Sequence, residues 1–223
     1  MKKKSNFLTP LLLVGLFIIF TSGCKKDYVD NTGKYTDPRD GNVYKTIIIG
    51  DQEWMSENLK YLPQIVDPDS GSPTKPCYYV YGYDSADVIN AKATAIYNAY
   101  GVLYNWPAAI NACPSGWHLS SQPEWEELIY SAKFDLSQLK EIGTTHWASP
   151  NRGATNKIGF TALPGGHRVG DGTFNGIGVL GYWWTSTECD TSHAWDCGIF
   201  SNYSISSCYV EKERGFSVRC IRD

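Results

Sequence analysis

The stretch that decides the fold runs Cys113-Pro114-Ser115-Gly116-Trp117-His118-Leu119-Ser120-Ser121-Gln122-Pro123-Glu124-Trp125-Glu126-Glu127-Leu128. Ser121 and Glu124 have capping-box spacing, in which the serine oxygen accepts from the glutamate N–H and the carboxylate accepts from the serine N–H. Behind this cap lies an apolar stripe at helical spacing, made of Trp125, Leu128, Ile129 and Ala132. We therefore predict a short strand, then a helix that begins after Ser121 and packs one face on a sheet.

The N-terminal residues have the three parts of an export signal. Lys2 to Lys4 form a positive region, Leu11 to Phe20 an apolar region, and Thr21-Ser22-Gly23-Cys24 a small-residue site that ends in cysteine. This arrangement resembles a bacterial lipoprotein signal, so we expect residues 1–23 to be removed and Cys24 to carry lipid, including palmitate. A transmembrane anchor is the alternative, but a membrane span needs about 20 apolar residues and the apolar run over residues 11–20 is only about half that length. The expected partner is a membrane, and the expected location is the outer membrane or the cell surface.

Composition narrows the class of protein further. Without the three leader lysines the chain has 17 basic and 23 acidic residues, a net charge of −6, which argues against nucleic acid as a partner. The eight Trp, 15 Tyr and 21 Gly are typical of a loop-rich extracytoplasmic fold, either a recognition protein or a β-rich core filled with aromatics. We expect residues 24–40 to be a flexible tether and residues 41–223 to form a single domain.

Several segments carry local structural signals. Residues 43–55 read as a hairpin with a Gly50-Asp51 turn, which would pair Ile49 with Gln52 and Ile47 with Trp54. We expect a helix over residues 91–100, another with Pro107 in its first turn, and a strand running into a bend over 159–168. Residues 169–181 are predicted to be a long loop, and strands are predicted over 182–187, 194–200, 205–211 and 216–221.

One short motif concerns modification. Asp84-Ser85-Ala86 resembles the O-glycosylation acceptor motif of Bacteroidetes, with a plain turn as the alternative reading.

Six cysteines remain after Cys24, and an even number in an exported protein predicts disulfides, with 15 possible pairings. None has the C-x-x-C spacing typical of zinc or thioredoxin-like redox sites. A turn centred on Asn202-Tyr203 would place Cys197 opposite Cys208 across a hairpin, within bridging distance.

Seven phrases in order resemble one family, the Fibrobacter succinogenes major paralogous domain. They are Asp40-Gly41-Asn42-Val43-Tyr44-Lys45-Thr46, Trp54-Met55-Ser56-Glu57-Asn58-Leu59-Lys60, Tyr100-Gly101-Val102-Leu103-Tyr104-Asn105-Trp106, Cys113-Pro114-Ser115-Gly116-Trp117-His118-Leu119, Gly159-Phe160-Thr161-Ala162-Leu163-Pro164-Gly165-Gly166, Tyr182-Trp183-Trp184-Thr185-Ser186-Thr187-Glu188 and Gly215-Phe216-Ser217-Val218-Arg219-Cys220. The resemblance covers about Thr36 to Asp223 and brings no activity with it.

A more distant similarity is to C-type lectins and formylglycine-generating enzymes. It implies an α+β, C-type-lectin-like domain with small antiparallel sheets, two or three helices, long loops and disulfides. It also implies a long-range Cys113–Cys220 disulfide, which leaves Cys77–Cys189 by elimination. The chain lacks the Glu-Pro-Asn and Trp-Asn-Asp triplets of calcium-binding lectins and the closely spaced reactive cysteines of formylglycine-generating enzymes.

No catalytic residues, cofactor or metal site are predicted. The four histidines have no i, i+4 pair, and no nucleophile, phosphate or dinucleotide motif is present. An acid beside aromatic platforms suits sugar binding, and the expected ligand-binding residues are Trp183, Trp184, Glu188, Trp195 and Asp196. The alternative is that Trp183 and Trp184 alternate, one in the core and one half exposed.

The sequence thus predicts an exported, lipid-anchored module that recognises a glycan or protein ligand through its C-terminal loops. Two rivals stay open. One is a structural component of the envelope or of an appendage. The other is a hydrolytic or oxidative enzyme, which needs two acids or free thiols that meet in a pocket.

Overall fold

A computed structural model describes residues 31–200 and 204–223, and the side chains of residues 204–208 are not described. The predicted leader, the lipidated Cys24 and the first part of the tether lie outside the described residues. Residues 31–223 form one compact unit. Within the part of the chain that is described, no helix is both long and apolar enough to cross a membrane.

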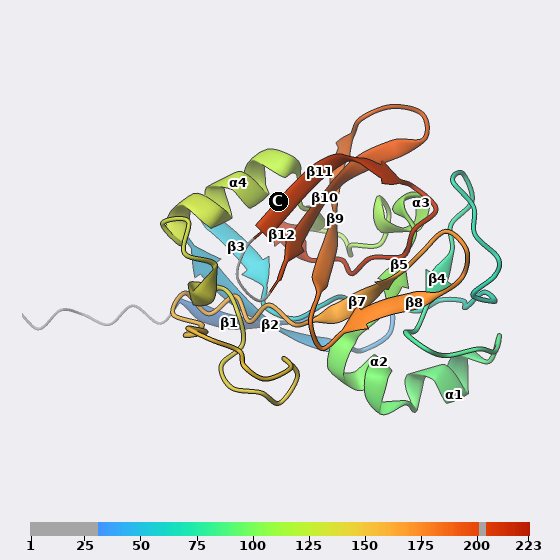
Figure 1. The fold of residues 1–223 in the computed structure, drawn as a ribbon, viewed down its shortest axis with the longest axis horizontal. Coiled ribbons are helices and arrows are strands. Elements are labelled where there is room, and N and C mark those ends of the chain that lie inside the picture. Colours follow the sequence, from blue (N-terminus) through green and yellow to red (C-terminus); the bar gives the residue numbers. More distant parts are fainter. Residues whose placement is uncertain (1–30, 201–203) are drawn as a thin grey trace, which may run out of the picture. The chain divides into compact units, whose positions relative to one another are not determined.

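The described chain is an α+β domain of short helices and small sheets (Figure 1). Its strands, in chain order, are β1 Thr32–Thr36, β2 Val43–Ile49, β3 Gln52–Met55, β4 Tyr78–Tyr79, β5 Leu103–Tyr104, β6 Trp117–Leu119, β7 Gly165–Arg168, β8 Phe174–Ile177, β9 Gly181–Glu188, β10 His193–Ile199, β11 Ser204–Glu211 and β12 Cys220–Arg222. Its helices are α1 Val88–Lys92, α2 Ala95–Tyr100, α3 Trp106–Ala109 and α4 Gln122–Ser131, with a 3₁₀ turn at Leu136–Gln138.

The first sheet has the strand order β1-β2-β3-β12-β6, so the last strand lies between β3 and β6. Figure 1 shows β12 next to β3. The predicted hairpin is confirmed, with Ile49 opposite Gln52 and Ile47 opposite Trp54. The prediction of a flexible tether as far as residue 40 is wrong, because residues 32–36 pair with β2 along their whole length. Backbone hydrogen bonds of an edge strand order this polar segment despite its lack of periodicity.

The second sheet has the order β11-β10-β9-β7-β8, and β4 with β5 forms a third, two-stranded sheet. The long loop predicted over residues 169–181 is in fact interrupted by β8, which pairs with β7. The glycine content of this segment hid the strand: Gly176 within β8 takes a positive φ angle of 80° that other residues rarely adopt. Of the predicted strand over 216–221, only its end forms β12.

The helix predicted from the cap is confirmed as α4. Both the N–H and the hydroxyl of Ser121 donate to Glu124 Oε2, at 2.6 and 2.8 Å. The apolar stripe faces the core as expected: Trp125, Leu128 and Ala132 are buried and Ile129 is partly buried. The stripe packs on β9 and β10, and the Trp125 ring meets the edge of Trp54 at 5.2 Å between centroids.

The single helix expected over 91–100 is two helices in the structure. Thr94 interrupts it, since its hydroxyl accepts from the N–H of Tyr97 and caps a new helix. The helix with Pro107 in its first turn is confirmed as α3, and Asn105 caps it by accepting from the N–H of Ala108.

The cysteines pair only in part as predicted. Cys113 and Cys220 form the long-range disulfide, with 5.8 Å between their Cα atoms and a separation of 107 positions along the chain. The Cys77–Cys189 pairing is wrong, because Cys77 is a free thiol while Cys189 is disulfide-bonded. The Cys197–Cys208 pairing is also wrong, since Cys197 is free and lies opposite Ser206, two positions from the predicted partner. The side chain of Cys208 lies outside the described part.

Candidate functional site

The two tryptophans of the predicted ligand site lie in the core. Trp183 and Trp184 alternate across β9, but both have no exposed surface because hydrophobic clusters cover both faces of this strand. The indole N–H of Trp184 donates to the carbonyl of Tyr104 at 2.7 Å, and that of Trp183 donates to Asn58 Oδ1 at 2.9 Å. Neither ring can stack on a ligand, so the expectation that one is half exposed is wrong.

The other three predicted residues do not form a common exposed surface, because they differ in burial and one is held in an ion pair. Asp196 is buried, whereas Trp195 is partly buried. Glu188 is more than half exposed but forms an ion pair with Lys212, whose ammonium also donates to the carbonyl of Asp190 and lies 4.5 Å from the centre of the Trp106 ring. The prediction that these five side chains form one ligand-binding surface is wrong for the three that are buried.

A buried polar framework lies where five of the seven family phrases meet. The side chain of Arg219 is fully buried, and its Nε donates to Asn58 Oδ1 at 2.8 Å. Its other nitrogens donate to the carbonyls of Met55, Phe160 and Thr161 at 3.1, 2.8 and 2.8 Å. Burial lowers the pKa of Arg219 to about 9, and the charge of Glu57 opposes this shift. Because this pKa still lies above neutral pH, the guanidinium stays protonated there.

Asn58 is the centre of this framework. Its Oδ1 accepts from Arg219 and Trp183, and its Nδ2 donates to the carbonyl of Tyr100 at 3.0 Å and to Ser217 Oγ at 3.2 Å. One side chain therefore joins β9, the closing segment of the chain and the end of α2. All of its hydrogen-bonding atoms are used, which fixes the backbone on either side of it.

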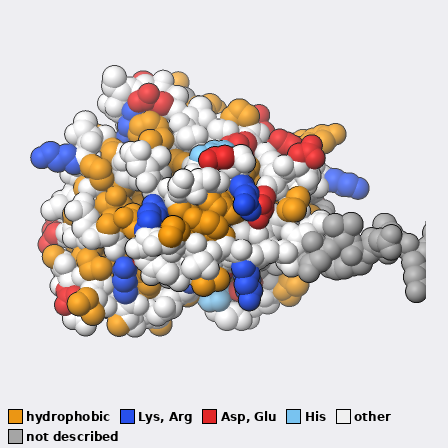
Figure 2. All heavy atoms as spheres, turned by 180° about the vertical axis from the view of Figure 1, so that it is seen from behind, with side chains coloured by type: hydrophobic (Ala, Val, Ile, Leu, Met, Phe, Trp, Pro, Cys, Tyr) orange, Lys and Arg blue, Asp and Glu red, His pale blue; other side chains and the backbone are white. Residues whose placement is uncertain are grey.

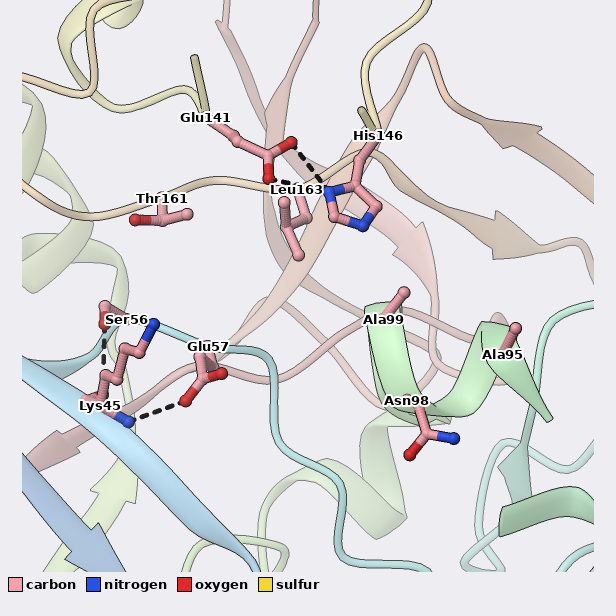
Figure 3. Close-up of a pocket in the computed structure, with 10 residues that line it drawn as sticks. All are labelled: Lys45, Ser56, Glu57, Ala95, Asn98, Ala99, Glu141, His146, Thr161 and Leu163. Atoms are coloured by element: carbon pink, nitrogen blue, oxygen red, sulfur yellow. Dashed lines mark hydrogen bonds and ion pairs between the residues drawn. The ribbon is translucent and has the colours of Figure 1, made fainter. Parts of the chain in front are cut away.

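A hollow of about 690 Å³ opens beside this framework (Figure 3). Its walls come from three regions of the chain: β2 with the segment after β3, helix α2, and the segment from residue 141 to 163. The lining residues are Lys45, Ser56, Glu57, Ala95, Asn98, Ala99, Glu141, His146, Thr161 and Leu163. The size falls within the range usual for small-molecule sites, about 300–1,000 Å³.

On one wall, Glu141 holds the ring of His146. Nδ1 of His146 lies 2.8 and 2.9 Å from the two carboxylate oxygens of Glu141. Figure 3 shows the second ring nitrogen turned away from Glu141, toward the side of the pocket that α2 forms. The edge of the imidazole also packs on Tyr100, with 5.4 Å between ring centroids.

The segment that carries this pair is fixed at several points. Trp147 is buried, and its indole N–H donates to the carbonyl of Ala162 at 2.9 Å. Asn151 Nδ2 donates to the carbonyls of Glu141 and Gly143 at 2.8 and 2.7 Å. The Glu141–His146 pair is thus positioned by packing and hydrogen bonds on both sides of it.

The opposite wall is formed by β2 and the segment after β3. Glu57 Oε2 accepts from the backbone N–H of Lys45 at 2.8 Å, and Ser56 Oγ donates to the carbonyl of the same residue at 3.3 Å. Figure 3 places these residues across the pocket from Glu141 and His146. The ammonium of Lys45 forms no ion pair with another described residue.

The backbone of the pocket is strained at Thr161. This residue has φ of 55°, an uncommon value for a β-branched side chain. Asn156 Oδ1 accepts from its N–H at 2.8 Å, while Arg219 donates to its carbonyl. Strain of this kind persists only where the surroundings enforce it, and it is concentrated at functional sites.

Sequence reasoning missed this pocket. Glu57, Asn58 and Arg219 stand in the phrases that carry the family resemblance, and this was the available signal for them. Nothing in the spacing of Glu141 and His146 indicated their role, because they enter the pocket with residues about 40 to 100 positions earlier in the chain. Among the described residues, no three His, Cys, Asp or Glu side chains gather closely enough to hold a metal ion.

Figure 2 shows the back of the molecule relative to Figure 1. Hydrophobic side chains gather near its middle, and Lys or Arg side chains alternate with Asp or Glu around them. This face therefore has no extended region of one charge. The predicted O-glycosylation residue, Ser85, is exposed in a bend before α1, and its modification stays a prediction.

The architecture and the buried framework define a disulfide-containing α+β domain in which the closing segment is locked to the early segment after β3. The chain belongs to the Fibrobacter succinogenes major domain family, whose sequence profile matches residues 47–222. The family resemblance predicted from the seven phrases is confirmed. No significant match was found among curated proteins or among solved structures.

Proposed function

We propose that this protein is an exported, lipid-anchored binding module whose pocket, lined by Glu57, Asn98, Glu141, His146 and Thr161, recognises a hydroxyl-rich group such as the end of a glycan. The observation that carries the proposal is the arrangement of polar side chains from three separate segments around one hollow. Lipid on Cys24 would hold the module at the outer membrane or the cell surface. We propose no cofactor and no nucleic-acid partner.

The chemistry of the walls favours a neutral, hydroxylated ligand. Carboxylate, amide and imidazole groups can accept or donate hydrogen bonds, as sugar hydroxyls require. Asn98 donates to the carbonyl of Thr94 at 2.9 Å through Nδ2, which leaves its Oδ1 as an acceptor at the pocket. Ala95, Ala99 and Leu163 supply apolar surface between these groups, against which the carbon face of a sugar ring can pack.

The framework under the pocket favours tight recognition. Asn58, Arg219 and Trp183 fix the backbone on which Glu57 and Thr161 are placed. A site fixed before binding loses less conformational entropy when the ligand enters.

Glycan-array binding by the mature domain tests the proposal. We expect the wild type to bind a defined set of glycans and expect Glu57→Gln to weaken binding by roughly 10- to 100-fold, the effect of a lost hydrogen bond to a charged group. Asn98→Ala, which removes a neutral and exposed amide, should weaken binding by roughly 2- to 10-fold. Glu126→Gln, an exposed residue of α4 away from the pocket, is the matched control and should bind normally. Absence of binding by the wild type would favour a structural envelope or appendage component.

We also infer that the fold is C-type-lectin-like. The long-range Cys113–Cys220 disulfide and the position of β12 between β3 and β6 support this inference. An experimental structure tests it, since superposition on C-type lectins should align β6, α4 and β12. An alignment limited to α4 would count against it.

A further inference from the structure

The Glu141–His146 pair has the geometry of a general base. A neutral histidine whose Nδ1–H donates to a carboxylate has an unprotonated Nε2, which can accept a proton. In this protein that nitrogen is on the wall of the pocket and turned away from Glu141 (Figure 3). We propose that His146 is a catalytic base and that the pocket hydrolyses an ester carried by its ligand, such as an acetylated sugar. The inference rests on the proposed function, because it uses the same pocket.

A carboxylate beside a histidine is not by itself evidence of catalysis, and this protein provides the comparison. His193 Nδ1 lies 2.9 and 3.0 Å from the carboxylate oxygens of Asp190, almost the same geometry as His146 with Glu141. That pair closes an exposed turn, since Asp190 also accepts from the N–H groups of Ser192 and His193. Glu141 and His146 differ because they line a hollow large enough for a substrate.

Neighbouring residues fix the orientation of both Glu141 and His146. Asn151 donates to the carbonyl of Glu141, and Tyr100 packs against the imidazole edge, so both members of the pair are held in place. Glu141 would act as a positioning residue that selects the tautomer of His146. The same division of roles between a carboxylate and a histidine operates in known hydrolytic sites.

The reaction balances with water as the only co-reactant. Nε2 of His146 takes a proton from water while the water oxygen forms a bond to the ester carbonyl carbon. The tetrahedral intermediate then expels the alcohol oxygen, breaking the carbon–oxygen bond of the ester. The histidine returns its proton to that oxygen, so the products are a carboxylic acid and the free sugar hydroxyl.

An ester fits the pocket better than a glycosidic bond does. The negative charge that develops on the carbonyl oxygen needs a positive partner. Lys45 lines the wall opposite His146, and its ammonium has no carboxylate partner among the described residues. Glycoside hydrolysis requires two carboxyl groups free to act as acid and base. Here Glu141 is already bound to His146 by both oxygens.

Hydrolysis of para-nitrophenyl acetate and of glucose pentaacetate by the mature domain tests the inference, with acetate release followed by NMR. We expect His146→Ala to lower kcat about 10²- to 10⁴-fold with a smaller change in KM, as for loss of a general base. Glu141→Gln should lower kcat roughly 10²-fold, and Glu141→Asp, which keeps the acceptor, should restore part of it. His193→Ala is the matched control and should keep full activity.

Ester hydrolysis that disappears in His146→Ala and persists in His193→Ala supports the inference, provided that the thermal unfolding midpoints of the variants stay near that of the wild type. Glycan binding without hydrolysis of either ester overturns the inference and leaves the binding function intact. Equal hydrolysis by wild type and His146→Ala also overturns it. Loss of both binding and hydrolysis in the wild type removes both proposals.

Discussion

Arg219 Nε donates to Asn58 Oδ1 at 2.8 Å across 161 positions of the chain, in a part of the core that water does not reach. A guanidinium in such a place needs acceptors for its donors, and three backbone carbonyls complete the set. The closing segment of the domain is thereby tied to the segment after β3 by hydrogen bonds as well as by strand pairing.

Asn58→Ala should destabilise the domain strongly. It removes the acceptor of two buried donors, Arg219 Nε and Trp183 Nε1, and each unsatisfied buried group costs about 1–3 kcal/mol. We expect the free energy of unfolding to fall by about 3 kcal/mol or more, measured by urea denaturation. Asn98→Ala, on the exposed face of α2, should change it by less than about 0.5 kcal/mol. A similar loss in both variants would contradict the role given to Asn58.

Removing the long-range disulfide should lower the free energy of unfolding more than removing a free thiol does. The double variant Cys113→Ser, Cys220→Ser frees a loop of 107 residues, worth up to about 4.7 kcal/mol on the chain-entropy model. Urea denaturation should therefore show a much lower midpoint than for Cys77→Ser.

Alkylation of the wild type without reductant checks the same cysteine assignment. Cys77 and Cys197 should react only after unfolding, because both are buried and burial, with the charge of Asp196, raises the pKa of the Cys197 thiol. Labelling of Cys113 in the unfolded, unreduced protein would contradict the disulfide.

His118 should make stability depend on pH. Its Nδ1 lies 2.7 Å from Asp223 and its Nε2 lies 2.9 Å from Glu124. Burial alone would lower the pKa of His118, but the hydrogen bonds and charges of these carboxylates outweigh it and raise the pKa. The stabilisation is therefore complete below the unfolded pKa of about 6.5 and is lost as the pH rises through the higher folded value.

At low pH the contact between His118 and Glu124 loses its stabilising effect for a different reason. Burial opposes ionisation of Glu124, but hydrogen bonds from Ser121 and His118 lower its pKa, so its contribution is lost as the pH falls below about 4.5. We expect His118→Gln to reduce stability by about 0.5 kcal/mol near pH 5.5, a magnitude typical of exposed pairs, and by less above about pH 8. An equal effect at both pH values, in urea denaturation, would refute this assignment.

Cys24→Ala should abolish lipid labelling. Acyl chains gain about 0.8 kcal/mol per buried methylene, so an acylated Cys24 would hold the protein on a membrane without a spanning helix. Cells grown with an alkyne analogue of palmitate should yield a labelled wild type and an unlabelled variant. Cys77→Ser is the control and should stay labelled. Absence of label from the wild type would remove the anchoring proposal.

Local spacing in the sequence determined those features that depend on neighbouring residues. The capping box and stripe placed α4, because hydrogen bonds at a helix start span three residues and a helical face repeats over four. The two-residue Gly50-Asp51 turn set the hairpin register in the same way. The seven phrases also identified the family, since their order along the chain is itself information.

The tertiary structure alone decided which side chains are buried and which meet. Trp183 and Trp184 alternate as strand residues do, but only the presence of a core on both sides of β9 buries both of them. Cys197 missed its predicted partner because β10 and β11 pair in another register, with Ile199 opposite Ser204 and Cys197 opposite Ser206. That register depends on the packing of both strands and cannot be read from cysteine spacing. The pocket combines β2, α2 and the segment around His146, and contacts between such distant segments depend on the packing of the whole domain.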